Sequence, residues 1–167
     1  MWTSIENYIN QVKEISQVLI QQNSENKQIY EENTEKYIKD LEKVEKQYKE
    51  ILQELNGQKA ICLNEALEYL AKDIKLEYIS LHTDHDENSM SAESIKNIIN
   101  KMNTENIKII LIGKDDSIKN AEILANETNA KIYKLDTVLT GATDKSAYID
   151  AANRNLEVLK SVLGDEK

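Results

Sequence analysis

The sequence predicts an α/β fold, in which a four-stranded parallel sheet flanked by helices is preceded by a helix and a long backbone helix. The evidence is a change of periodicity near Gly57. Before it, apolar residues recur every three or four positions, as they do on one face of a helix. After it, short apolar runs alternate four times with helical segments. Such alternation is typical of a parallel sheet whose right-handed crossovers are helices.

The first predicted helix covers residues 3–22. Its apolar side chains recur at spacings of three and four, which places them on one face. Thr3 or Ser4 is expected to cap its first turn, because a hydroxyl oxygen accepts the backbone N–H groups that are free there. A polar break over residues 23–26 ends this helix.

The second predicted helix, over residues 24–55, is the element around which the chain is organised. It contains neither Gly nor Pro. Ser24 is expected to cap its start, and Gly57 to take a left-handed conformation after its end. Its apolar stripe consists of Tyr30, Tyr37, Leu41, Val44, Tyr48, Ile51 and Leu55. At 1.5 Å per residue the helix would reach roughly 45 Å, so it must cross a larger body or pair with a second helix.

The remaining elements alternate to the end of the chain. Strands are expected at 59–63, 76–81, 107–112 and 130–135, and helices at 65–72, 91–102, 117–128 and 146–163. The third of these strands is an unbroken apolar run, which suits a central strand of a parallel sheet. We therefore expect an N-terminal helix (1–23), a long spanning helix (24–57) and a C-terminal α/β lobe (58–167).

The composition argues against several classes of protein. The net charge is −9 and the acidic residues are dispersed, which disfavours nucleic acid and anionic membranes as partners. There is no run of about 18 apolar residues that would predict a transmembrane helix. The first residues show neither the basic nor the apolar region of a signal peptide, so none is expected in this sequence. The single cysteine, Cys62, excludes an internal disulfide, and its apolar surroundings predict a buried, inert thiol.

Candidate binding residues follow the predicted strands. Ligands of parallel sheets bind beyond the carboxyl ends of the strands, where loops begin at Asn64, His82, Gly113 and Asp136. Asp136 is either a ligand or catalytic group, or else a turn or helix cap. Asn64 is either a helix N-cap or a ligand.

Both histidines of the chain, His82 and His85, lie in the acidic stretch 82–87. Imidazole and carboxylate together suit zinc, manganese or nickel. A flexible loop gives such ligands no fixed geometry. A solvated acidic loop is therefore the favoured interpretation, and a metal site is the alternative.

The sequence carries no enzyme signature. The residues after Gly113 lack the spacing and the Lys-Ser/Thr ending of a phosphate-binding loop. The serine-hydrolase pattern GxSxG is absent, and no nucleophile–base pair is apparent. We therefore expect a binding or interaction protein and no enzyme.

Several strings in the sequence together resemble one known family. They are Trp2-Thr3-Ser4, residues 26–33, residues 63–70, residues 135–141, and residues 148–150 with Asn155-Leu156. Their order and content are similar to those of the solute-binding proteins of zinc and manganese ABC transporters, the TroA-like metal-binding lipoproteins. The resemblance covers nearly the whole chain. It implies that the long helix connects two lobes, and that this chain comprises the tail of a first lobe, that helix and the C-terminal lobe.

The resemblance also implies a metal site, of which little remains. The family binds one divalent metal, zinc or manganese, through about four ligands. Asp136 matches one of them, and Asn64 stands where the family has a histidine or glutamate. The other two have no counterpart, and His82 and His85 are weaker candidates to replace them. Since an amide oxygen is a poor ligand for transition metals, we expect weak or no specific metal binding.

Partners and location are likewise implied by the resemblance. In the family, the partner is an ABC transporter permease, and the location is extracellular or periplasmic and membrane-anchored. The alternative is a structural or interaction module. In that case the apolar stripes of the two N-terminal helices, uncovered without a first lobe, pair in a homo-oligomer.

Overall fold

The computed structural model of the chain describes residues 2–55, 57–80 and 91–164. It confirms the predicted α/β fold with a four-stranded, all-parallel sheet. The strands are β1 (Lys59–Cys62), β2 (Glu77–Ser80), β3 (Ile109–Gly113) and β4 (Lys131–Leu135). Their order across the sheet is β2-β1-β3-β4, so β3 is central, between β1 and β4.

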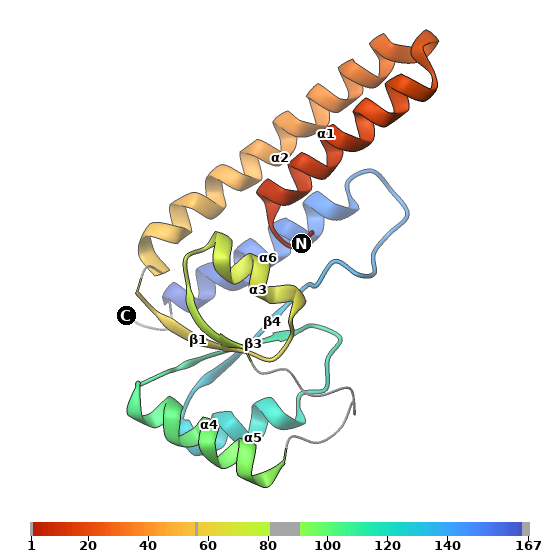
Figure 1. The fold of residues 1–167 in the computed structure, drawn as a ribbon. Helices are drawn as coiled ribbons and strands as arrows, with labels where there is room; N and C mark the ends of the chain where they lie inside the picture. Colours follow the sequence, from red (N-terminus) through yellow and green to blue (C-terminus); the bar gives the residue numbers. More distant parts are fainter. Residues whose placement is uncertain (1, 56, 81–90, 165–167) are drawn as a thin grey trace.

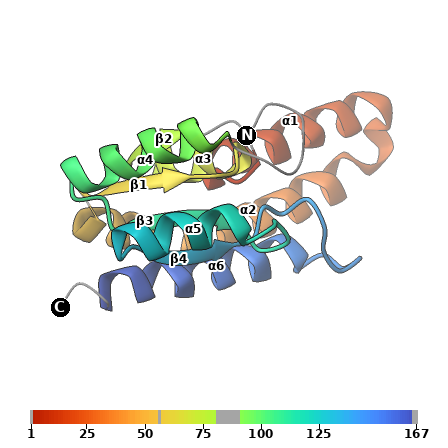
Figure 2. The same ribbon diagram turned by 90° about the horizontal axis from the view of Figure 1, so that it is seen from below.

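Helices make up most of the rest of the described chain. They are α1 (Ile5–Gln22), the 3₁₀ turn η1 (Ser24–Asn26), α2 (Lys27–Leu55), α3 (Ala66–Asp73), α4 (Ala92–Thr104), α5 (Lys119–Thr128) and α6 (Ala147–Gly164). Figure 1 shows α1 and α2 as an antiparallel hairpin that projects past the sheet, and Figure 2 shows the same projection from below. No helix within the described ranges is both long and apolar enough to cross a membrane.

The sheet separates two hydrophobic cores. One core packs α2, α3 and α6 against one face of the sheet, and the other packs α4 and α5 against the opposite face. Every residue of β3 is buried, and its side chains alternate between the two cores. Ile109 and Leu111 face the first core, whereas Ile110 and Ile112 face the second. The apolar run that predicted a central strand is explained by this double burial.

The predicted helix boundaries are largely confirmed. Ser4 caps α1 by accepting the backbone N–H of Asn7, and Ser91 caps α4 in the same way. Gly57 has a φ of +86°, the left-handed conformation that glycine adopts without strain. The predicted Ser24 cap of the long helix is wrong. Residues 24–26 form the 3₁₀ turn that joins α1 to α2, so α2 begins at Lys27.

The two halves of α2 have different surroundings. Its second half buries Leu41, Val44, Tyr48, Ile51 and Leu55 in the first core. Its first half packs on α1, where Tyr30 and Tyr37 are only partly buried. Large exposed apolar side chains lie on this distal part of the hairpin: Ile15, Val18, Leu19 and Ile29. The hairpin therefore offers an apolar surface that the described part of the chain does not cover.

Candidate functional site

The carboxyl ends of β1, β3 and β4 bring three candidate segments to one edge of the sheet. Asn64 follows β1, the turn at 113–116 ends β3, and Asp136 follows β4. Because β3 lies between β1 and β4, its turn is the neighbour of both other segments. The histidine candidates His82 and His85 lie outside the described residues.

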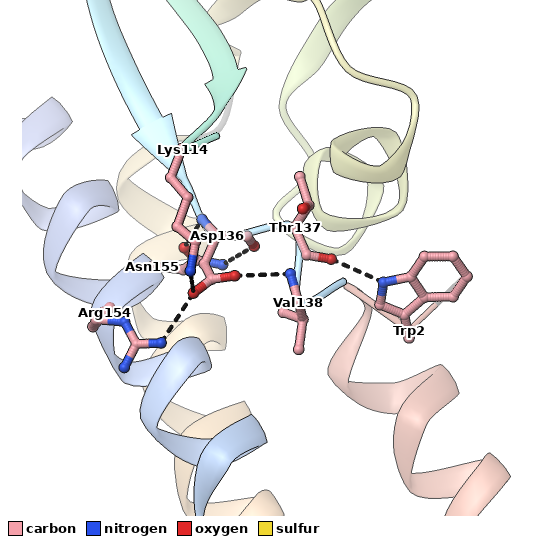
Figure 3. A network of polar contacts seen from close by, with 7 residues as sticks. All are labelled: Trp2, Lys114, Asp136, Thr137, Val138, Arg154 and Asn155. Carbon is pink, nitrogen blue, oxygen red and sulfur yellow. Dashed lines mark hydrogen bonds and ion pairs between the residues drawn. The ribbon is translucent and has the colours of Figure 1, made fainter. Parts of the chain in front are cut away.

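Asp136 is buried, and both oxygens of its carboxylate accept hydrogen bonds. Oδ1 accepts the backbone N–H of Val138 at 2.8 Å. Oδ2 accepts a hydrogen bond from Lys114 Nζ at 2.8 Å and another from Arg154 Nη2 at 2.9 Å (Figure 3). The Asp136 side chain is 3% exposed, whereas those of Lys114 and Arg154 are 36% and 59% exposed. The two cations therefore reach over the carboxylate from the solvent side.

These contacts set the charge state of Asp136. Burial by itself would raise the pKa of the carboxyl, because the charged form loses solvation. The hydrogen bonds from Lys114, Arg154 and the Val138 N–H outweigh burial and hold the pKa of Asp136 below its ordinary value. The carboxylate is consequently ionised at neutral pH and balanced by two positive charges.

Asn155 on α6 fixes the backbone of Asp136. The Asp136 N–H donates to Asn155 Oδ1 at 2.6 Å, and Asn155 Nδ2 donates to the Asp136 carbonyl at 2.9 Å. Asn155 is 4% exposed, so the pair of bonds is sheltered from water. It anchors the end of β4 to α6 and aims the carboxylate at Arg154, which precedes Asn155 on the same helix.

The loop after Asp136 is held in an unusual backbone conformation. Val138 has a φ of +57°, which is strained for a β-branched residue. The preceding carbonyl, of Thr137, accepts a hydrogen bond from Trp2 Nε1 at 2.8 Å (Figure 3). The carbonyl of Trp2 in turn accepts the Tyr148 hydroxyl at 2.8 Å. The start of the chain is thereby tied to the Asp136 loop and to α6.

Asn64 lies beside this site, where its side chain bonds both the start of α3 and the turn after β3. Its Oδ1 accepts the backbone N–H of Ala66, the first residue of α3, at 2.9 Å, but the N-cap of that helix is Glu65 and not, as the helix-cap alternative predicted, Asn64. Its Nδ2 donates to Asp116 Oδ2 at 2.9 Å, and the same oxygen accepts the Gly113 N–H at 2.8 Å. The turn after β3 thus connects Asn64, through Asp116, to the segment from which Lys114 reaches Asp136.

Four residues of this site were missed by sequence reasoning: Lys114, Asp116, Arg154 and Asn155. The first two had a usable signal, because they directly follow the central strand and must lie beside the other strand ends. Arg154 is the only arginine of the chain, but nothing in the helical pattern of α6 directs it toward Asp136. Across the described ranges, no group of three or more His, Cys, Asp or Glu side chains is placed to hold a metal ion.

An aromatic pocket adjoins the Asp136 loop. It has a volume of about 540 Å³ and is lined by Trp2, Tyr8, Tyr37, Tyr148 and parts of residues 138–147. The Tyr8 ring stacks on Tyr148 with a centroid distance of 3.5 Å. Burial, more than any charge, raises the pKa values of Tyr37 and Tyr148, so both phenols are neutral.

Cys62 has neither the exposure nor the charge state of a reactive thiol. It is buried in the first core, as predicted. Burial, followed by the nearby charge of Glu68, raises the pKa of the Cys62 thiol to about 12. A protonated, enclosed thiol is neither a nucleophile nor a ready metal ligand.

Comparison with known proteins identifies relatives over most of the chain. Residues 1–162 match the profile of a family described as "Zinc-uptake complex component A periplasmic" (ZnuA). The high-affinity zinc uptake system protein ZnuA of Bacillus subtilis is 31% identical over 158 residues, covering 92% of this chain and 49% of that protein. The manganese ABC transporter substrate-binding lipoprotein PsaA of Streptococcus anginosus is 21% identical, covering 93% and 52%. The chain therefore spans about half the length of the curated relatives it matches.

Solved structures show the same fold. The metal-dependent lipoprotein YcdH of Bacillus subtilis has a TM-score of 0.78 and 28% identity, covering 96% of this chain and 62% of that one. The solute-binding protein FpvC of Pseudomonas aeruginosa, in complex with Mn²⁺, has a TM-score of 0.83 and 22% identity, covering 99% and 62%. The second likeness, at lower identity, bears on the fold alone.

Proposed function

Because the chain belongs to the periplasmic zinc-uptake component A family, we propose that it is the C-terminal lobe, with its spanning helix, of a solute-binding protein of a zinc or manganese ABC transporter. In this proposal the protein binds a metal-ion solute and does not act as an enzyme. The names of the relatives support this proposal, since they describe zinc uptake and manganese substrate binding. In this interpretation residues 1–23 end a first lobe, residues 24–57 span the two lobes, and residues 58–167 form the second.

The proposal includes an incomplete metal site. A zinc site needs about four N, S or O donors, and a tight one needs several that are free to bind. The Asp136 carboxylate matches one ligand of the family, and both of its oxygens are already bonded. Asn64 offers an amide whose oxygen accepts the Ala66 N–H. The occupied carboxylate of Asp136 is the observation on which this part of the proposal rests.

Calorimetric titration of the chain with Zn²⁺ and with Mn²⁺, at micromolar concentration, tests the incomplete site. We expect no saturable one-to-one heat signal. The His82→Ala/His85→Ala variant is the matched comparison, and we expect it to give the same trace as the original chain. A clear one-to-one signal in the original chain would overturn the proposal, and its loss in the histidine variant would assign the metal to the acidic loop.

The partner and the location follow from the same membership. Relatives are named as lipoproteins of ABC transporters. We infer that the full protein works outside the cell membrane, anchored to it, and delivers its cargo to a permease. This chain supplies one of the two lobes that such a permease would contact.

A second candidate function is an interaction module that dimerises through its N-terminal hairpin. One observation favours it: the segment from Ile15 to Asn23 contains no charged residue, although 31% of the chain is charged. Ile15, Val18 and Leu19 are 59%, 54% and 43% exposed on that segment. Uncharged apolar surface of this kind is typical of the centre of an interface.

Sedimentation analysis at tens of micromolar tests the dimer. We expect the original chain to sediment as a dimer or larger species and the Ile15→Ser/Val18→Ser/Leu19→Ser variant as a monomer. The matched control is Ile123→Ser, which changes an exposed isoleucine on α5 and should leave the oligomeric state unchanged. A monomeric original chain would count against this candidate.

A further inference from the structure

The charges around Asp136 do not fit a bound divalent cation. One carboxylate oxygen, Oδ2, carries both Lys114 Nζ and Arg154 Nη2, at 2.8 and 2.9 Å (Figure 3). We propose that Lys114 and Arg154 are specificity-determining residues that take the place of a divalent cation at Asp136 and exclude such ions from it. This inference deepens the proposed function and rests on it.

The geometry makes the two side chains and a divalent cation compete for the same carboxylate oxygen. A zinc ion bound to Oδ2 would lie about 2 Å from that oxygen. Since Lys114 and Arg154 are each within 2.9 Å of the same atom, the ion could be no more than about 5 Å from either positive group. Like charges at that separation repel strongly near a protein interior. The other oxygen, Oδ1, accepts the Val138 N–H.

The burial pattern shows why the pair holds its place. A carboxylate that is 3% exposed needs counter-charges, because it has little water to solvate it. Lys114 comes from the turn after β3 and Arg154 from α6, so the carboxylate at the end of β4 is covered from two elements. An ordinary surface ion pair lacks this burial and is easily displaced.

Paramagnetic broadening by Mn²⁺ in amide NMR spectra of the full chain tests the inference, since it detects even weak binding near a given amide. The His82→Ala/His85→Ala background removes the imidazole ligands from all samples. In that background we expect no selective broadening of the Val138 and Asn155 signals. With Lys114→Met/Arg154→Met added, we expect both signals to broaden selectively. The Mn²⁺ concentration needed should be at least tenfold below the highest concentration that leaves the background chain without selective broadening, a gain on the order of one unit in log affinity.

Two controls isolate the cause. Lys43→Met/Lys160→Met removes two lysines from exposed ion pairs with Asp40 and Glu157, and so makes the same change in net charge. It should leave the Val138 and Asn155 signals as they were. Adding Asp136→Asn to the Lys114/Arg154 variant should abolish the gained broadening, because the carboxylate is then gone.

The outcomes separate this inference from the proposed function. A folded Lys114→Met/Arg154→Met variant that gains no selective broadening overturns the exclusion by Lys114 and Arg154, while the incomplete site stands. Equal broadening in the background chain also overturns it. Tight one-to-one binding by the original chain overturns both. If the double variant does not fold, the single variants Lys114→Met and Arg154→Met carry the same test, and each should show part of the gain.

Discussion

At the scale of single residues, the central feature is one buried carboxylate with two cations on it. Asp136 is held by Asn155 through its backbone and by Lys114 and Arg154 through its side chain. Charged hydrogen bonds of this kind contribute more to stability than neutral ones, and removing one partner leaves the others poorly satisfied. The same residue that resembles a metal ligand therefore has a structural task in this lobe.

Asp136→Asn removes the charge that holds Lys114 and Arg154, and should lower the free energy of unfolding by about 1–2 kcal/mol at pH 7. The loss is no larger because the exposed heads of Lys114 and Arg154 regain water. The amide retains an acceptor for the Val138 N–H but loses the charge. The folded-state pKa of Asp136 is lowered, so its contribution is present above the unfolded value of about 3.9 and is lost as the pH falls through the folded value. The gap between the two proteins should therefore narrow as the pH falls below the unfolded value of about 3.9.

Urea denaturation at pH 7, 5 and 3 measures this gap. Asp40→Asn is the control, because Asp40 lies in an exposed pair with Lys43 and its replacement should change stability little. A gap that stays constant down to the lowest pH, or that widens in acid, would refute the stated role of the ionised carboxylate.

At the scale of elements, α2 connects the projecting hairpin with the lobe. Its second half packs on α6 and the first core, and its first half packs mainly on α1. A buried hydrogen bond joins α2 to α6: the Tyr48 hydroxyl donates to the Ala152 carbonyl at 2.8 Å. This bond fixes the position of α2 along α6, and hence the direction in which the hairpin leaves the lobe.

Tyr48→Phe should lower the free energy of unfolding by about 1 kcal/mol, because it removes a buried hydrogen bond without changing the packed ring. Thermal or urea denaturation measures the loss. Tyr30→Phe, on the distal half of the same helix, is the matched control and should change stability by less than about 0.5 kcal/mol. Equal losses in the two variants would show that the contact between α2 and α6 has no special weight.

At the scale of the whole molecule, most of the fold could be predicted because its signals are local. The double burial of β3 appears as an uninterrupted apolar run, and the hydroxyl caps Ser4 and Ser91 appear beside the helices they start. The Ser24 cap failed because the hairpin turn is tightened by a 3₁₀ segment, whose polar residues look the same in sequence as a cap.

The site could be predicted only in part. Asp136 and Asn64 could be placed at this edge of the sheet because they follow strands, but their metal-ligand roles stay a prediction, and the Asn64 oxygen is bonded to the start of α3. Arg154 could not be found, because its contact with a residue 18 positions away depends on how α6 docks on β4. Such docking depends on packing across the whole lobe, which periodicity along one helix does not describe.

The claim that this lobe replaces a metal by its own cations is tested most directly by its melting temperature with and without metal. A ligand present at a hundredfold excess over its dissociation constant adds about 2.7 kcal/mol of stability, which raises the melting temperature of a chain of this size by about 5–10 °C. We expect the melting temperature in about 100 µM Zn²⁺ or Mn²⁺ to differ from that in EDTA by less than about 1 °C, because no site has a micromolar dissociation constant. A rise of about 5 °C or more that saturates at one equivalent of metal would contradict it.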